Sequence, residues 1–198
     1  MIGGETAEHF RQNDYDLAGF CTGIVEKNQI VDGSNIRAGD VVIGIESSGF
    51  HSNGYTLIND MIWEKDKPCY YPAMYEKLMP GLLTPTTIYS PLIQHLLDEV
   101  PILGMAHITG GGLPENLPRC LPEGLTVDVD YGAWDVPEMF ETIQLAGNIS
   151  DDEMRNVFNM GIGFCLVVPS DLVEHTQCLI ADTPFGMRSW IIGNVREQ

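Results

Sequence analysis

Apolar segments of strand length alternate with segments of helical spacing, and this alternation restricts the fold more than any other feature. Strands are predicted at residues 18–26, 41–45, 102–107, 125–129, 160–168 and 189–195. Between them, apolar residues recur every three or four positions, which is typical of amphipathic helices. Helices are predicted at residues 55–64, 88–100, 136–146, 151–158 and 171–180. Residues 65–80, rich in proline and tyrosine, are predicted to be an irregular connection. The pattern indicates a domain of helices layered on a sheet.

Composition excludes several classes of protein. The chain has 28 acidic and 10 basic side chains, a formal net charge of -18. Nucleic-acid binding needs clustered lysine and arginine, so we expect no nucleic-acid partner. We expect no membrane partner either, because no apolar run has the length of a membrane span. The beginning of the chain lacks the features of a signal peptide, and the five scattered cysteines form no C-x-x-C pair. These features favour a cytosolic protein without a disulfide frame or a zinc site.

Two loops share one design. The stretches SGFHSNG (residues 48–54) and AHITGGG (residues 106–112) each leave an apolar strand and lead toward a helix. Each places a histidine among small hydroxyl residues and glycines. Successive backbone amides in such a turn point the same way, and the helix that follows adds its positive end. The two loops therefore predict a site for an anion such as a sugar phosphate, built from main-chain amides rather than lysines.

His51 and His107 are the candidate proton-transfer residues, because an ordinary imidazole titrates close to neutral pH. The glycines fit the same interpretation, since a Cβ at Gly110 or Gly111 would stand where the phosphate or ribose lies. The structural alternatives stay open. Three consecutive glycines equally suit a tight turn between a strand and a helix. A histidine in a loop is often only a surface or capping residue, and His95 and His175, inside predicted helices, are interpreted as structural.

Several longer blocks resemble one enzyme family. In chain order they are GGETAE, DYDLAGFCTGIVEK, IVDGSNIRAGDVVIGIESSGFHSNGYTL, LLTPTTIY, GMAHITGGGLPENLPRCLPEG and FNMGIGFCLVVP. From Gly3 to Val195 the chain closely resembles the phosphoribosylformylglycinamidine cyclo-ligases, also called aminoimidazole ribonucleotide synthetases. The resemblance implies an enzyme that uses ATP and Mg²⁺ to close the imidazole ring of formylglycinamidine ribonucleotide. HSNGY and FNMGIG favour this family over its relatives, which include selenophosphate synthetase and thiamine-monophosphate kinase.

The resemblance also implies roles for individual residues. Glu5 and Thr6 would lie near ATP, with Glu5 as a ligand of Mg²⁺. His51 and His107 would be catalytic. Arg119 would support the second loop from the helix that follows it. The substrate would be bound by Ser52, Asn53, Gly54, Thr109, Gly110, Gly111, Gly112 and Asn116.

The fold that the resemblance implies is α+β. Residues 1–27 would be the truncated end of an N-terminal ATP-binding domain, and residues 28–198 a three-layer αβα domain with a mixed sheet. The family's G-T-D-G-V-G-T-K segment, which takes part in holding ATP and Mg²⁺, is not in the sequence. The family's P-T-R-I-Y-V-K motif is altered, with Thr87 and Pro91 in place of its two basic residues.

We therefore expect the C-terminal portion of a cyclo-ligase, active as a homodimer or when paired with an N-terminal half. Two alternatives stay open at this point. The chain can be a module that binds a phosphoribosyl ligand without chemistry, or a regulatory partner of a complete enzyme.

Overall fold

The computed structural model describes residues 19, 21–62, 72–184 and 186–198. The chain divides into two compact units, Met1–Ile30 and Val31–Gln198. In the first unit the structure describes one 3-10 turn, η1 (Lys27–Gln29). The strand predicted at residues 18–26 is absent from Gly19 and residues 21–26, which are extended but unpaired. The second unit carries the sheet and the α-helices of the described residues.

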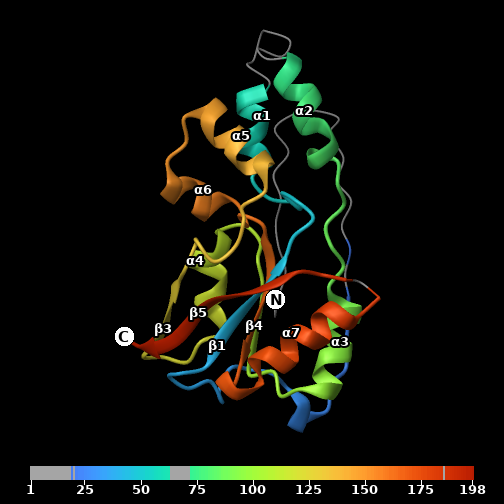
Figure 1. Ribbon diagram of the computed structural model, residues 1–198, viewed down its shortest axis with the longest axis vertical. Coiled ribbons are helices and arrows are strands. Elements are labelled where there is room, and N and C mark those ends of the chain that lie inside the picture. The colour runs from blue at the N-terminus through green and yellow to red at the C-terminus, as the bar shows by residue number, and fades with distance from the viewer. Residues whose placement is uncertain (1–18, 20, 63–71, 185) are drawn as a thin grey trace. The chain divides into compact units, whose positions relative to one another are not determined.

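The described residues form one five-stranded sheet with the order β2-β4-β1-β5-β3 (Figure 1). Its strands are β1 (Val41–Glu46), β2 (Gly104–His107), β3 (Leu125–Val129), β4 (Ile162–Val168) and β5 (Ser189–Glu197). All four strand pairs are antiparallel. The α+β class is confirmed, but the predicted mixed sheet is wrong. Strands β1 and β2 run in one direction, yet β4 lies between them and runs in the other, so no two parallel strands are neighbours.

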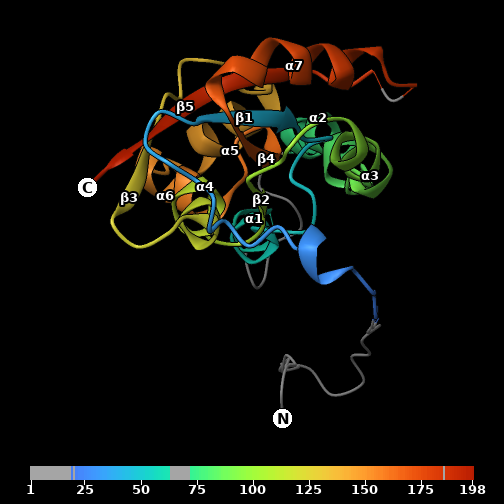
Figure 2. The ribbon, with the colours of Figure 1, turned by 90° about the horizontal axis from the view of Figure 1, so that it is seen from below.

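Helices cover both faces of this sheet, as the three-layer prediction requires. One face packs on α3 (Ser90–Glu99) and α7 (Val173–Asp182) through a cluster that includes Ile43. The other face packs on α4 (Gly112–Asn116), α5 (Glu138–Gly147) and α6 (Asp151–Val157) through a cluster that includes Val42. Figure 2 shows α7 on one side of the strands and α4 and α6 on the other. Val42 and Ile43 are consecutive and point to opposite faces, so β1 is buried on both sides.

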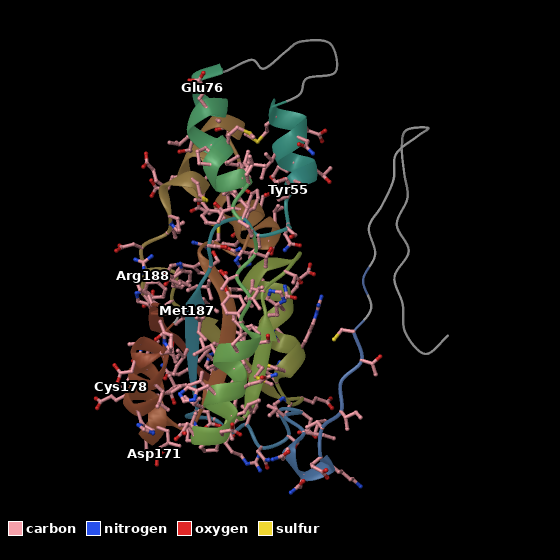
Figure 3. The ribbon with its side chains drawn as sticks, turned by 90° about the vertical axis from the view of Figure 1, so that its right-hand side faces the viewer. Tyr55, Glu76, Asp171, Cys178, Met187 and Arg188 are labelled. Atoms are coloured by element: carbon pink, nitrogen blue, oxygen red, sulfur yellow. The ribbon has the colours of Figure 1, made fainter. Side chains whose placement is uncertain are left out.

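Helices α1 (Tyr55–Ile62) and α2 (Pro72–Leu82) lie with α5 and α6 toward one end of the sheet (Figure 1). The 3-10 turn η2 (Leu117–Cys120) follows α4, and η3 (Ser170–Leu172) precedes α7. Tyr55, at the start of α1 (Figure 3), donates its hydroxyl to the carbonyl oxygen of Leu82 at 2.6 Å. This bond ties the beginning of α1 to the end of α2.

Helix α2 contradicts the irregular connection predicted at residues 65–80. Pro72 is its first residue, where the missing N–H costs nothing, and Pro80 lies in its last turn. The two prolines therefore mark the ends of a helix rather than a break. No helix in the described part of the chain is long and apolar enough to cross a membrane.

Candidate active site

The sheet topology brings the two histidine-bearing loops to one place. Strands β1 and β2 pair with opposite sides of β4, and both are antiparallel to it. They therefore run in the same direction, and their carboxyl ends lie at the edge of the sheet where β4 begins. We call residues 47–54, after β1, the first loop, and residues 107–112, which begin with the last residue of β2, the second loop. Ser47 N–H donates to Gly161 O at 2.8 Å, and Ile108 N–H donates to Gly163 O at 2.9 Å. Both loops are thus hydrogen-bonded to the beginning of β4.

The candidate side chains of the two loops are neighbours in space. The ring centroids of His51 and His107 lie 6.5 Å apart. The Tyr89 ring lies 6.1 Å from His51 and 6.0 Å from His107, so it bridges the pair. Phe164 stacks on His107 with centroids 6.0 Å apart. Both histidines therefore lie beside aromatic rings: Tyr89, from the segment before α3, contacts both, and Phe164 of β4 contacts His107.

His51 is a buried, neutral imidazole. Its side chain is 5% exposed, and its backbone has a left-handed φ of 56°. Nε2 accepts a hydrogen bond from Ser48 N–H at 3.2 Å, which places the ring proton on Nδ1. Nδ1 has no hydrogen-bond partner among the described residues. Burial, with a smaller contribution from His107, lowers the pKa of His51 to about 4. At neutral pH this imidazole carries no charge and is not a cationic acid.

His107 is the more accessible of the two histidines. It is the last residue of β2, and its side chain is exposed to solvent. Partial burial of the ring, which stacks on Phe164, lowers its pKa below the ordinary value. A neutral, accessible imidazole at the mouth of the site is suited to accepting a proton.

The Asn116 side chain holds the second loop through hydrogen bonds to its carbonyl oxygens. The side chain is 4% exposed, and its Nδ2 donates to Gly112 O at 2.7 Å and to Gly110 O at 3.1 Å, with Thr109 O a longer third contact at 3.4 Å. No peptide bond of the described residues is cis, and in a trans peptide the C=O and the following N–H point in opposite directions. Because Thr109 O and Gly110 O face Asn116, the N–H groups of Gly110 and Gly111 point away from it. Two consecutive amides aimed the same way form a site suited to an anion.

The three glycines of the second loop have different reasons to be glycine. Gly111 and Gly112 have left-handed φ values of 91° and 58°, and a Cβ on Gly112 would collide with the carbonyl oxygen of Arg155. For these two, the tight turn is a sufficient explanation. A Cβ on Gly110 would meet only Asn53 Oδ1, at 3.6 Å, across the gap between the loops. Gly110 alone therefore fits the prediction of space kept for a ligand.

The helix after this turn differs from the expectation. Helix α4 has five residues and continues into η2, so its dipole adds little to the amides. Pro114 is its third residue and lies within the first turn, where proline is tolerated.

Asn159, which the sequence did not single out, is the counterpart of Asn116 for the first loop. It is 2% exposed, and its Nδ2 donates to Gly49 O at 2.8 Å. Its Oδ1 accepts from Gly161 N–H at 2.8 Å and from Ser47 Oγ at 3.1 Å. The motif FNMGIG contains this residue, and an asparagine two residues before a turn glycine was the available signal.

A third segment, the LLTPTTIY block, lies along the first loop. The hydroxyl oxygens of Ser52 and Thr86 are 3.1 Å apart, and Ser48 Oγ donates to Pro85 O at 2.7 Å. Tyr89 donates its hydroxyl to Glu46 O at 2.7 Å. Thr86 and Tyr89 therefore belong to the site, although sequence analysis did not assign them. In the sequence, the LLTPTTIY motif indicated the family but not the roles of these two residues.

The other predicted residues fall into different places. Gly54 packs against Phe158, since a Cβ there would enter that ring. Thr109 donates its hydroxyl to Asn116 Oδ1 at 3.2 Å, and Arg119, whose side chain is exposed, donates to the same atom at 3.2 Å. Gly54, Thr109 and Arg119 therefore support the two loops through packing or hydrogen bonds. Glu5 and Thr6 lie outside the described residues.

The part of the chain that the structure describes does not supply a metal site, because it contains no group of three or more His, Cys, Asp or Glu side chains able to hold an ion. No step below is therefore assigned to Mg²⁺. A cavity of about 210 Å³ lies between α2 and α5, lined by Leu78, Glu138, Met139 and Thr142. None of these lining residues belongs to either loop.

Comparison with known proteins places the chain in a family. Residues 37–198 match the family described as AIR synthase related protein, C-terminal domain, so the chain belongs to it. The chain is 48% identical over 203 residues to a protein from Prochlorococcus marinus (strain MIT 9211) named phosphoribosylformylglycinamidine cyclo-ligase, with 100% of this chain and 58% of that protein covered. A protein of the same name from Desulfitobacterium hafniense (strain DSM 10664 / DCB-2) is 44% identical, with 100% and 59% covered. The chain thus spans less than two thirds of the length of these relatives.

Solved structures agree on the fold. Thiamine-monophosphate kinase from Stenotrophomonas maltophilia K279a superimposes with a TM-score of 0.59 at 15% identity, covering 88% of this chain and 52% of that chain. E. coli HypE, a hydrogenase maturation protein, gives 0.55 at 21% identity, covering 84% and 46%. At these identities the likeness concerns the fold alone.

Proposed function

We propose that this chain is the C-terminal part of a phosphoribosylformylglycinamidine cyclo-ligase. The reaction is the ATP-dependent closure of formylglycinamidine ribonucleotide to 5-aminoimidazole ribonucleotide in cytosolic purine biosynthesis. The observation that carries the proposal is the meeting of the two loops, with the His51 and His107 rings 6.5 Å apart. The names of relatives at 44–48% identity supply the reaction.

In this proposal the phosphate of the ribonucleotide binds to the amides of Gly110 and Gly111. These N–H groups are turned outward because Asn116 holds the neighbouring carbonyls. Main-chain amides suit this role in a chain with a net charge of -18, since the site needs no lysine. Ser52 and Asn53, on the facing loop, are assigned to the ribose and its substituents.

We assign the proton transfer of ring closure to His107, because it is exposed and its lowered pKa keeps it neutral and able to accept a proton. His51, buried and neutral, orients groups through hydrogen bonds instead. Cyclisation of this kind depends mainly on holding the nitrogen close to the activated carbon, so precise positioning is the main contribution of these loops.

The rest of the active site comes from a second polypeptide segment. The chain spans 58% of the length of its Prochlorococcus relative, and the family assigns it to the C-terminal domain. We propose that residues 1–27 end an ATP-binding domain, with Glu5 and Thr6 near ATP and Mg²⁺, and that residues 28–198 form the second domain. The ATP-binding half completes the site, and the assembly is a homodimer or a pairing with that half.

A second candidate is a module that binds the ribonucleotide without converting it. The meeting of the two loops and the outward amides of the second loop support binding by themselves, without assigning any step of the chemistry. The two candidates share the ligand and differ in turnover.

One experiment separates them. Calorimetric titration of the chain with formylglycinamidine ribonucleotide should give saturable binding, whereas no heat at millimolar ligand would overturn both candidates. Addition of an N-terminal half that carries G-T-D-G-V-G-T-K should then yield ATP-dependent aminoimidazole ribonucleotide. Binding without turnover at every ratio of the two chains would leave the binding module.

A further inference from the structure

We propose that Asn159 is a positioning residue of the candidate active site, which sets the conformation of the first loop and thereby the place of the His51 ring beside His107. The role in catalysis rests on the proposed function. The positioning itself is a property of the free chain and can be measured without any ligand.

The Asn159 carboxamide joins the first loop to the turn before β4. Asn159 donates to Gly49 O and accepts from Ser47 Oγ and Gly161 N–H. Ser47 N–H in turn donates to Gly161 O at 2.8 Å. A carboxamide is needed for this pattern, because the side chain must donate on one side and accept on the other. The network is buried, so no water replaces a missing partner at low cost.

Backbone strain is concentrated at the two segments that Asn159 joins. His51 and Met160 have left-handed φ values of 56° and 52° without being glycine. Such conformations persist only where surrounding contacts impose them, and they cluster at functional sites. Met160 follows Asn159 directly, and its carbonyl oxygen is held by Trp134 Nε1 at 2.8 Å. The turn is therefore rigid on the side from which Asn159 reaches the loop.

The path from Asn159 to His51 is short. Asn159 fixes Ser47 and Gly49, and between them Ser48 N–H donates to His51 Nε2 at 3.2 Å. The ring then lies over Gly163, where an added Cβ would be 2.6 Å from His51 Cε1. Gly163 also accepts from the second loop through Ile108 N–H. A small shift of the first loop would therefore move His51 relative to His107.

The test is the Asn159→Asp variant, observed through the ring nitrogens of His51 by long-range ¹H–¹⁵N NMR spectroscopy. The substitution keeps the shape but sets a carboxylate oxygen against Gly49 O. In the wild type we expect a single neutral tautomer of His51 with the proton on Nδ1. In a folded Asn159→Asp variant we expect both neutral tautomers of His51. The Ser48 amide proton should also lose the chemical-shift change that its hydrogen bond to His51 Nε2 causes. Asn35→Asp, the same change at an exposed turn residue, should match the wild type.

Wild-type His51 signals in a folded Asn159→Asp variant would overturn the proposal. If that variant does not fold, Asn159→Ser decides, because the shorter side chain cannot reach Gly49 O and Gly161 N–H together. Ser47 is left unchanged, since its Oγ also lies 3.0 Å from Gly49 O. We expect partial tautomer mixing in Asn159→Ser, and unchanged His51 signals there would also overturn the proposal.

Ligand titration gives the second measurement. Formylglycinamidine ribonucleotide should bind Asn159→Asp about tenfold more weakly than the wild type. If the wild type itself does not bind, the proposed function fails, while the NMR result still decides the positioning.

Discussion

The carboxamide oxygen of Asn53 lies 3.6 Å from the position that a Cβ on Gly110 would take. The two residues belong to different loops, and this distance is the clearest measure of how closely the loops meet. It is ordinary van der Waals contact, so a methyl group fits there without moving the backbone. The space is therefore open to a ligand in a way that the surroundings of Gly111 and Gly112 are not.

Gly110→Ala should separate ligand binding from folding. We expect the free energy of unfolding in urea to change by less than about 1 kcal/mol, since Gly110 has no left-handed φ. The dissociation constant for formylglycinamidine ribonucleotide should rise about tenfold or more, because the methyl group occupies ligand space. Gly112→Ala is the matched control and should destabilise the fold by roughly 2–4 kcal/mol through strain and collision with Arg155. Equal effects of both variants on folding and on binding would contradict this division of roles.

Gly163→Ala and Tyr89→Phe should compensate each other. A Cβ on Gly163 would collide with the Tyr89 hydroxyl and approach His51 Cε1, so Gly163→Ala should cost about 1–3 kcal/mol. Tyr89→Phe should cost about 1 kcal/mol, because it removes the bond to Glu46 O. The double variant should be more stable than the sum of the two by at least about 0.5 kcal/mol, as measured in a double-mutant cycle. Simple additivity would show that the hydroxyl and Gly163 do not share this space.

His51 should make the fold sensitive to acid. Its pKa is about 4 in the folded chain and near 6.5 in an ordinary exposed histidine. Between these values the unfolded chain binds more protons, so stability rises with pH by up to about 1.4 kcal/mol per unit for this group. The stabilisation is complete above pH 6.5 and is lost toward pH 4.

Urea unfolding from pH 4 to 7 measures this slope. His51→Asn should flatten it, since asparagine tolerates a left-handed backbone and does not titrate. His107, with a lowered pKa of its own, keeps part of the slope. His175→Asn, on the exposed side of α7, controls for the loss of a histidine as such. Identical slopes in the wild type and His51→Asn would mean that His51 is not held neutral by the fold.

Asn116→Asp should disorder the second loop. A carboxylate cannot donate to Gly110 O and Gly112 O, and it would repel both oxygens. We expect a loss of roughly 1–3 kcal/mol of stability. Faster amide hydrogen exchange at Gly112, whose N–H donates to Thr109 O at 3.0 Å, should accompany it, measured against α7 amides in the same sample. Unchanged exchange at Gly112 would show that Asn116 does not hold this turn.

Periodicity predicted the fold well where segments are buried. The strand bounds agree within about two residues at β1, β2, β3, β4 and β5, since apolar β-branched runs can be satisfied only inside a sheet. Helix α2 was missed because Pro80 and the tyrosines of that region resemble an irregular connection. The strand at residues 18–26 was predicted from its apolar pattern, but Ile24 is fully exposed in the described chain. An apolar pattern alone does not supply a neighbouring strand.

The sequence predicted that the two loops, which carry His51 and His107, build one site, but it did not predict the strand order that brings them together. Their meeting depends on β4 lying between β1 and β2, and strand order is not encoded locally. Burial could not be predicted either. The proton-transfer role suggested for both histidines assumed an ordinary pKa, whereas the buried ring of His51 is held neutral. Asn159 escaped notice because its partners are distant in the chain.

The two loops follow strands that pair with opposite sides of β4. An insertion in β4 would therefore disturb both loops at once. Insertion of one residue early in β4 would slide Gly163 and Asn159 relative to both neighbours at once and turn every following side chain to the opposite face. An insertion in the turn between β3 and α5 would leave that alignment untouched. Insertions and deletions among homologous chains should therefore be rare in β4 and tolerated in most other segments.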